Sequence, residues 1–395
     1  MAGWFPTGCA CKRDGKEGLR MGATFVRDLT ELAQISEDER RRLEPVTRRY
    51  AFAANRYYLS LVNWADPDDP IRRIVVPDEG ELQPWGRLDP SEEAAYTVMP
   101  GLEHKYPDTV LMLVSRLCGG VCRFCFRKRL FLKDEEEEED ILDDVDGAVR
   151  YIASRKEVTD VLLSGGDPLM LPPSRLERLI SAVASVPHVR TIRVGSKVPA
   201  YMPARLAPGS GIVDVLARHS PPGRRIYLAC HFSHPRELSP QAHRALRALR
   251  EAGVVLVNQT PLLRGVNDDP LVLSTLLKEL SAHGVAPYYV FQCRPASGNL
   301  PYVLPLETAY SIFRRAVSRC SGLSARVRFV MSHATGKVEV VGLAGGTLVV
   351  RYHRSPDPRR TGAVLLLPRN PAAFWLDDYP TPESPRGALV GAAPR

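Results

Sequence analysis

Short apolar strands alternate with amphipathic helices through the middle of the chain, and this alternation restricts the fold more than any other feature. Strands joined by helices indicate a parallel sheet. A run of this length favours a closed or partial (β/α) barrel over a doubly wound sheet. The expected strands are Thr109–Ser115, Asp160–Leu163, Thr191–Val194, Arg225–Ala229, Val254–Val257, Pro287–Phe291 and Arg326–Met331, and the expected helices are 141–154, 173–186, 212–218, 240–252, 270–283 and 306–320.

The pattern changes on both sides of this run, which divides the 395 residues into three parts. Residues 1–105 are predicted to form a helical and irregular N-terminal region, residues 106–337 the barrel core, and residues 338–395 a small C-terminal β extension with a flexible tail. In the extension we expect antiparallel strands at Val338–Val341 and Thr347–His353 and a packing anchor at 374–376. The last dozen residues are expected to be disordered.

Three cysteines directly follow the first expected strand of the barrel, in a C-x3-C-x2-C spacing. Cys118, Cys122 and Cys125 cannot easily bridge one another without strain, but their thiolates can converge on one metal cluster. Three ligands leave one iron of a [4Fe–4S] cluster without a protein ligand, and a small molecule can bind and react there. The alternative is a structural zinc site, which needs a fourth ligand such as His231 or His234.

Composition and charge restrict the other classes of function. Eight cysteines in a chain of this length do not make a disulfide scaffold, and their distribution fits a reducing cytoplasm. No apolar run of roughly 18 residues is present, so we predict no membrane span, and the N-terminus lacks a secretory signal. The net charge of +8 is compatible with nucleic acid or with small anions as ligands, but no nucleic-acid-binding motif is present. An acidic run at 134–140 is interpreted as the solvated start of a helix.

The cysteine loop also resembles a known signature. Cys118–Cys125 is similar to the motif of radical S-adenosylmethionine (SAM) enzymes, whose fold is a partial (β/α)6-type barrel. In that family SAM chelates the open iron, and its reductive cleavage gives a radical that abstracts hydrogen. The resemblance implies a [4Fe–4S] cluster, SAM and an external electron donor of the flavodoxin or ferredoxin type. The cofactor-binding residues that it implies are Ser164, Gly165, Gly166, Asp167, Ser196, His231 and Gln259.

Over residues 89–337 the resemblance narrows to the lysine 2,3-aminomutase family. Members use pyridoxal 5′-phosphate (PLP), which forms a Schiff base with a lysine, to carry the substrate nitrogen between adjacent carbons. Lys337 matches that catalytic lysine, Lys105 and Tyr106 match residues at the PLP phosphate, and Arg127 matches the residue that binds the substrate carboxylate. The similar stretches include Pro100–Asp108, Gly195-Ser196, His231–Pro235, Asn258-Gln259, Leu263–Asp268, Pro287–Tyr289 and Gln292-Cys293.

The chain departs from that family at several positions. The two acidic residues around the distal ammonium of lysine are replaced by Arg294 and Val330, and a cation cannot stabilise an ammonium. An arginine would rather bind a carboxylate or phosphate of the substrate, so L-lysine is not the expected substrate. Thr109 stands where relatives carry an arginine, so the phosphate site is weakened or rebuilt. His333-Ala334-Thr335 replaces the glycine run before Lys337, which leaves the use of PLP open.

Three functions follow from these observations. The first is an isomerase, a PLP-dependent radical aminomutase for an α-amino acid with an acidic or neutral side chain, for example a glutamate-like one, and it is the one we favour. The second is a radical SAM enzyme of another reaction type, independent of PLP, that acts on a peptide, a protein side chain or a natural-product precursor. The third is a non-catalytic metal-binding or nucleic-acid-interacting protein. The subunit number stays open, a homo-oligomer included.

Overall fold

A computed structural model describes residues 25–131, 141–380 and 389–390. One sheet of thirteen strands dominates it, and its central strands β5 to β11 are all parallel and adjacent in sequence order. The predicted α/β fold is therefore confirmed. The parallel strands are β5 (Thr109–Ser115), β6 (Asp160–Gly165), β7 (Thr191–Ser196), β8 (Ile226–Cys230), β9 (Val255–Leu262), β10 (Ala286–Gln292) and β11 (Arg328–His333).

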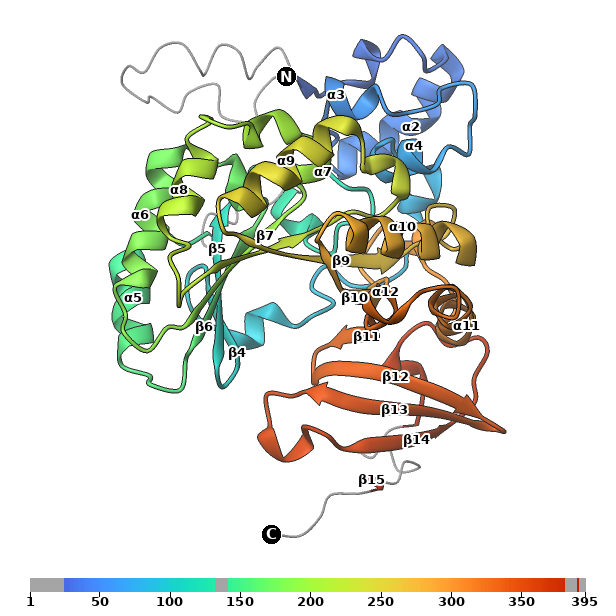
Figure 1. The fold of residues 1–395 in the computed structure, drawn as a ribbon. Coiled ribbons are helices and arrows are strands. Elements are labelled where there is room, and N and C mark those ends of the chain that lie inside the picture. Colours follow the sequence, from blue (N-terminus) through green and yellow to red (C-terminus); the bar gives the residue numbers. More distant parts are fainter. Residues whose placement is uncertain (1–24, 132–140, 381–388, 391–395) are drawn as a thin grey trace.

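Helices connect these strands and cover the outer side of the curved sheet (Figure 1). Local sequence sets where several of them begin. Ser239 and Asp269 cap α9 and α10 with their side chains, and each is followed by a proline in the first helical turn. The helix predicted from residue 141 begins only at Val145, because the Asp144 carboxylate accepts a hydrogen bond from the Gly147 amide at 2.7 Å. The helices are α5 (Val145–Ala153), α6 (Pro173–Ala184), α7 (Val198–Tyr201), α8 (Ile212–Arg218), α9 (Pro240–Glu251), α10 (Pro270–Ala282), α11 (Leu306–Val317) and α12 (Gly322–Ala325).

Several strands extend further toward their carboxyl ends than the apolar pattern predicts. Ladder pairing continues into polar and glycine residues, as in the pairs Ser115–Gly165 and Ser196–Cys230. Successive side chains of a strand point to opposite faces of the sheet. In β6, Val161 and Leu163 pack into the main core under the helices, whereas Leu162 and Ser164 line the inner side. The functional side chains therefore lie on the inner face, at the strand ends.

The sheet does not close through strand pairing, but side chains link the two sides of its parallel part. Before β5 lie β3 (Thr97–Met99) and β4 (Leu102–Tyr106), and after β11 lie β12 (Gly336–Ala344) and β13 (Thr347–Arg354). The Tyr96 hydroxyl and Lys105 Nζ donate hydrogen bonds to the carbonyls of Ala334 and His333, both at 2.9 Å. Arg354 pairs with Asp108 across the same gap. We call these contacts the seam, and they make the sheet a partial barrel, as predicted.

The extension after β11 forms an antiparallel sheet with its own core. It contains β12, β13, β14 (Val364–Pro368) and β15 (Leu389–Val390), which continue the main sheet in antiparallel order. The predicted anchor is confirmed for Trp375 and Leu376, which are buried against this core. The acidic run at 134–140 and nearly all of the last dozen residues lie outside the described residues. Strands from all three predicted parts belong to the same sheet. The sheet therefore does not mark boundaries between the three parts, and the division stays a prediction.

The N-terminal region packs against the cysteine loop and holds it in place (Figure 1). Asn55 Nδ2 donates to the Gly119 carbonyl at 2.6 Å, and the Val121 amide donates to the Ala53 carbonyl at 2.7 Å. A fully buried ion pair adds to this, in which Arg123 donates two hydrogen bonds to Glu81 at 2.7 and 2.9 Å. The elements of this region are β1 (Phe25–Val26), α2 (Glu37–Arg49), β2 (Ala54–Asn55), α3 (Arg56–Leu59) and α4 (Pro70–Val75). No helix among the described residues is both long and apolar enough to cross a bilayer.

Replacement of Glu81 by alanine is expected to lower the free energy of unfolding by about 3–5 kcal/mol. The reason is that the change leaves the guanidinium of Arg123 and the ammonium of Lys128, which also contacts Glu81, buried without their carboxylate. Glu79 is the matched control, because its salt bridge with Arg42 is exposed and should contribute less than about 1 kcal/mol. Anaerobic thermal unfolding measures both variants, and equal losses would show that the buried pair does not hold the loop.

Candidate active site

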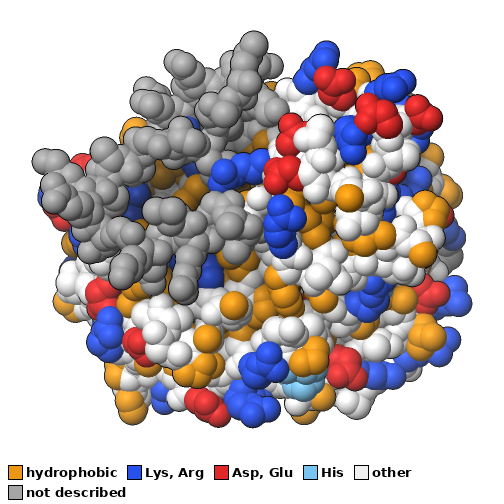
Figure 2. Space-filling model, turned by 90° about the horizontal axis from the view of Figure 1, so that it is seen from above, with side chains coloured by type: hydrophobic (Ala, Val, Ile, Leu, Met, Phe, Trp, Pro, Cys, Tyr) orange, Lys and Arg blue, Asp and Glu red, His pale blue; other side chains and the backbone are white. Residues whose placement is uncertain are grey.

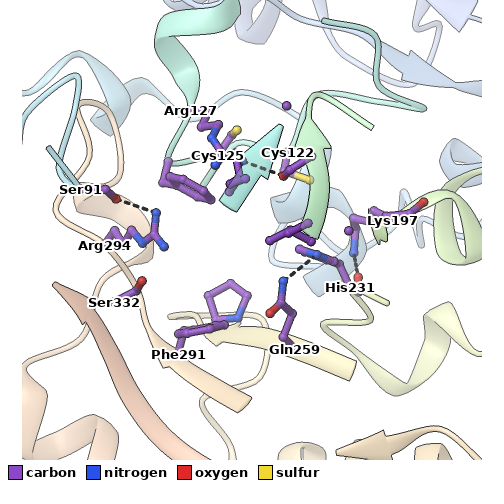
Figure 3. A pocket seen from close by; sticks show the side chains of 18 of the residues that line it. Ser91, Cys122, Cys125, Arg127, Lys197, His231, Gln259, Phe291, Arg294 and Ser332 are labelled. Atoms are coloured by element: carbon purple, nitrogen blue, oxygen red, sulfur yellow. Dashed lines mark hydrogen bonds between the residues drawn. The ribbon is translucent and has the colours of Figure 1, made fainter. Parts of the chain in front are cut away.

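A pocket lies at the carboxyl ends of the parallel strands, on the inner side of the partial barrel. Figure 3 shows Cys122, Cys125 and Arg127 on one side of it, His231 and Gln259 on another, and Arg294 facing Ser332 on a third. Every candidate residue predicted from the sequence contributes to its lining: Cys118, Cys122, Cys125, Ser164, Gly165, Gly166, Asp167, Ser196, His231, Gln259, Lys105, Tyr106, Lys337, Arg127 and Arg294. These residues thus lie around one pocket, as a common site requires, while the role of each residue stays a prediction.

The three cysteines line one wall of the pocket. Their loop turns back on itself through a hydrogen bond from the Cys125 amide to the Cys122 carbonyl at 3.0 Å. Burial raises the pKa of all three thiols, that of Cys122 to about 12, so the metal-free thiols are protonated at neutral pH. Among the described residues, no three His, Cys, Asp or Glu side chains converge on a point where a single ion could bind. In an iron–sulfur cluster each thiolate would bind a different iron, whereas a zinc site brings its ligands to one ion.

Gly165 and Gly166 allow a close approach, but to the chain's own backbone. A β-carbon on Gly165, which has a φ of +109°, would lie 2.6 Å from the Ser115 carbonyl oxygen, and one on Gly166 would lie 2.6 Å from that of Leu117. The Asp167 amide donates to the same Leu117 carbonyl at 2.6 Å. These glycines therefore pack the end of β6 onto the residues that lead into the cysteine loop.

The side chains of Asp167 and Ser196 bond to each other and to backbone. The Asp167 carboxylate accepts hydrogen bonds from Ser196 Oγ at 3.0 Å and from the Lys197 amide at 2.7 Å. Burial raises the pKa of Asp167 to about 6 against these hydrogen bonds. The hydrogen bond between the two side chains thus connects the ends of β6 and β7 and stabilises this part of the pocket lining.

His231 and Gln259 form an uncharged polar pair on the next wall. The Gln259 side-chain nitrogen lies 3.0 Å from His231 Nε2 (Figure 3). Burial, together with the charges of Lys197 and Arg127, lowers the pKa of His231 to about 3, so its imidazole is neutral. A neutral imidazole beside an amide suits hydrogen bonding to an uncharged polar ligand group.

Lys337 lies on β12 and reaches the pocket among aromatic rings. Its Nζ is 5.6 Å from the Tyr106 ring centroid and 5.7 Å from those of Tyr289 and Phe291. No hydrogen bond or salt bridge to this amine is found within the described part of the chain. Burial and the nearby cations, Arg294 first among them, lower the pKa of Lys337 well below its usual range. A neutral amine is nucleophilic toward a carbonyl group, and that is what a Schiff-base lysine requires.

The altered residues before Lys337 form a tight hairpin that leaves the lysine in the pocket. Ser332 pairs with Lys337 and His333 with Gly336, whose φ is +141°. Side chains secure the turn, since His333 lies 2.9 Å from Asp377 and 2.8 Å from the Thr335 hydroxyl. The substitution of the glycine run therefore changes how the turn is held without removing the lysine from the site.

Arg127 is buried and already paired. Its guanidinium donates to both carboxylate oxygens of Glu93 and to Ser164 Oγ, at 2.8 to 3.1 Å. Burial would raise the pKa of Glu93, but Arg127 and Arg129 lower it to about 2. A guanidinium has five N–H donors, so both terminal nitrogens of Arg127 keep one for a ligand carboxylate.

Arg294 presents a cation to the pocket without a carboxylate partner among the described residues. It donates to Ser91 Oγ at 2.7 Å (Figure 3). Its guanidinium lies over the Phe126 ring, 3.7 Å from the ring centroid. Burial lowers its pKa to about 10, so it still carries its charge at neutral pH. Val330, the other position where the family has an acid, is fully buried in β11 and does not line the pocket.

Lys105 and Tyr106 end β4 beside the seam. Lys105 Nζ donates to the carbonyls of His333 at 2.9 Å and Ser91 at 3.4 Å, and burial lowers its pKa to about 8. Burial raises the pKa of Tyr106 to about 12, so its hydroxyl stays protonated. Both face the Lys337 end of the pocket, where an anionic group would find a cation and a hydroxyl donor.

Sequence reasoning missed several charged residues of the lining. Glu103 has a buried carboxylate oxygen without a hydrogen-bond partner, and burial, followed by the charge of Glu93, raises its pKa to about 8. Alternation along β4 gives a usable signal, because Glu103 lies two residues before Lys105 and so shares its face. The same rule places Arg193 beside Gly195 on β7. Arg354 had no such signal, since it lies in the C-terminal extension.

Comparisons with known proteins agree with this geometry. The family model described as the radical SAM superfamily matches residues 112–274. The "Putative L-lysine 2,3-aminomutase" of Aquifex aeolicus (strain VF5) is 48% identical over 356 residues, which are 90% of this chain and 94% of that protein. The L-lysine 2,3-aminomutase of Fusobacterium nucleatum is 34% identical over 85% of this chain and 76% of its own length. The glutamate 2,3-aminomutase of Clostridioides difficile (strain 630) is 31% identical over 76% of this chain and 70% of its own length.

Proposed function

Since the chain belongs to the lysine 2,3-aminomutase family of the radical SAM superfamily, we propose that it moves the amino group of an α-amino acid to the adjacent carbon. The proposed cofactors are a [4Fe–4S] cluster, SAM and PLP. One observation carries the proposal: the amine of Lys337 and the thiols of Cys118, Cys122 and Cys125 line the same pocket. A radical source and an amine carrier are useful to one reaction only if both reach the same substrate.

The residues present fit these groups. Bound together, the cluster and SAM supply a hydrogen-abstracting radical, and PLP supplies a carrier for the migrating nitrogen. Cys118, Cys122 and Cys125 would bind three irons of the cluster as thiolates. Lys337 would hold PLP, between the rings of Tyr106, Tyr289 and Phe291 that flank its amine. SAM would bind beside His231, next to Gly195, where a β-carbon would lie 3.9 Å from His231 Nε2.

The charges of the pocket favour a substrate with an acidic side chain, such as glutamate. Arg294 is a buried cation with a guanidinium fork suited to a carboxylate. Two carboxyl groups act on Arg294, Glu93 and Glu103. Glu93 is ionised but already pairs with Arg127 and Arg129. Glu103 is mostly protonated at neutral pH because burial raises its pKa to about 8. A lysine ammonium would meet the Arg294 cation instead of a carboxylate, which disfavours L-lysine. Arg127 would bind the α-carboxylate with its remaining N–H donors.

The proposal is tested by the substrate preference of the anaerobically reconstituted enzyme. We expect β-amino acid formation from L-glutamate and little from L-lysine, detected by mass spectrometry together with 5′-deoxyadenosine. Arg294→Ala should lower kcat/KM for L-glutamate by about 10- to 100-fold, since it removes a charged hydrogen-bond donor to the side-chain carboxylate. Arg264→Ala, outside the pocket lining, is the matched control. Preferred turnover of L-lysine would overturn the substrate assignment, and absence of any β-amino acid product would overturn the aminomutase itself.

Two observations favour the aminomutase over the alternative functions. The hairpin at residues 333–335, which motivated a PLP-independent reaction, keeps Lys337 in the pocket. On the face in Figure 2, basic and acidic side chains are interspersed, whereas a nucleic-acid-binding surface gathers cations. We propose further that the electron donor is of the flavodoxin or ferredoxin type and that the enzyme acts in the cytoplasm, both on the grounds of the sequence alone.

A further inference from the structure

Arg354, the last residue of β13, faces the same side of the sheet as the candidate catalytic lysine. The two residues are direct partners in the antiparallel pairing of β12 and β13, so their side chains emerge as neighbours. Both line the pocket. Like charges directly opposite each other destabilise a sheet, unless one is neutral or an anion lies between them. The pairing therefore raises the question of what Arg354 does there.

The charges near Lys337 do not balance. Four cations act on its amine, Arg294, Arg193, Arg354 and Lys105. Only two of them have a carboxylate partner among the described residues: Arg193 pairs with Asp160, and Arg354 pairs with Asp108. The Asp108 side chain is 58% exposed, so water screens much of its charge. A buried surplus of positive charge of this kind suits an anion that carries more than one charge, and a phosphate monoester carries about −1.5 to −2.

The guanidinium of Arg354 lies where such an anion would need it. Its NH2 group donates to the Thr109 hydroxyl at 3.1 Å as well as to Asp108, and its centre is 4.4 Å from the Tyr106 ring centroid. It thus occupies the space beside residue 109, at the pocket end formed by Lys105 and Tyr106. No hydrogen bond from its Nε or NH1 is found among the described residues, so three of its five N–H donors are available to a ligand.

We propose that Arg354 binds the phosphate group of PLP, and so supplies from β13 the guanidinium that the chain lacks at Thr109. This assignment rests on the proposed function, because it presumes that Lys337 holds PLP. The competing interpretation is that Arg354 only fastens the seam through Asp108. The seam contacts use only the NH2 group of Arg354, whereas phosphate binding would use the N–H donors of Nε and NH1.

The two roles are separated by comparing PLP with pyridoxal, which has the same ring and aldehyde but no phosphate. Reconstituted enzyme is freed of PLP, and each compound is titrated by absorbance under anaerobic conditions. Arg354→Ala should raise the Kd for PLP by about 10- to 100-fold and change the Kd for pyridoxal less than about twofold. Arg351→Ala is the matched control, because this arginine of the same strand pairs with Glu339 and does not line the pocket.

Two further variants guard against a loss that is only structural. Asp108→Ala breaks the seam pair but keeps Arg354, so it should retain the preference for PLP over pyridoxal. The double variant Thr109→Arg with Arg354→Ala should regain part of the lost preference. If Arg354→Ala keeps the wild-type preference, or if Asp108→Ala loses it equally, the phosphate assignment is overturned while the proposed function stands. If wild-type enzyme binds neither compound, the PLP-dependent function and the assignment fail together.

Discussion

Replacement of Lys337 by alanine is expected to abolish aminomutase activity, with a loss on the order of 10³-fold or more. The amine lies among three aromatic rings and several cations inside the pocket, and within the described residues it has no hydrogen bond or salt bridge, whereas Lys105 is bonded to two carbonyls. Its removal should also eliminate the PLP absorbance band of the reconstituted enzyme. Borohydride reduction of the wild-type enzyme, followed by peptide mass spectrometry, should locate the modified residue at position 337.

The matched control is Lys278→Ala, which removes an exposed lysine of helix α10. It should leave absorbance and activity unchanged. Lys337→Ala should retain its iron and should still cleave SAM slowly without substrate turnover, because the cysteine loop follows β5 whereas Lys337 lies on β12. An active Lys337→Ala enzyme, or PLP attached to another lysine, would contradict the assigned role.

Replacement of Cys122 by serine is expected to remove both the cluster and the radical chemistry. Iron content should fall from about four atoms per chain to well below one, since a [4Fe–4S] cluster with two thiolate ligands is not retained. Reductive formation of 5′-deoxyadenosine from SAM should become undetectable. Iron and sulfide analysis, together with the visible absorption of the cluster, measures the first effect, and chromatography measures the second.

Cys320→Ser is the control for this experiment, because its thiol follows helix α11, contacts the Ala316 carbonyl and lies outside the pocket. It should keep the iron content of the wild type. Zinc in place of iron in the wild-type protein would contradict the cluster and support the alternative of a structural zinc site. Full iron occupancy in Cys122→Ser would remove that cysteine from the ligand set.

The sequence was sufficient for the parts of the fold and site that depend on local pattern. Apolar runs and amphipathic patterns located the strands and helices, and helix α8 has its predicted bounds of Ile212–Arg218. Polar residues at strand ends were correctly placed in one pocket, because the carboxyl ends of parallel strands meet at one edge of a sheet. The three cysteines could be named from their spacing, and Lys337 from the resemblance to the lysine 2,3-aminomutase family.

The rest depended on contacts between distant segments. Nothing in the local pattern indicates that Glu93 holds Arg127, or that Asp167 accepts a hydrogen bond from Ser196. The role of Arg354 depends on the register between β12 and β13, which includes a bulge after Lys337. A shift of one residue would turn Arg354 to the other face of the sheet, and register is not legible in either strand alone.

The open sheet has a mechanical consequence. The cysteine loop follows β5, and Lys337 lies on β12. The proposed cluster ligands and the proposed PLP lysine are therefore carried by strands that are seven positions apart in one continuous sheet. They face each other only because every strand pair between them adds its share of twist. The distance between the proposed cluster and the proposed PLP site therefore depends on the summed twist of all the strands between them. The seam contacts stabilise that curvature of the sheet.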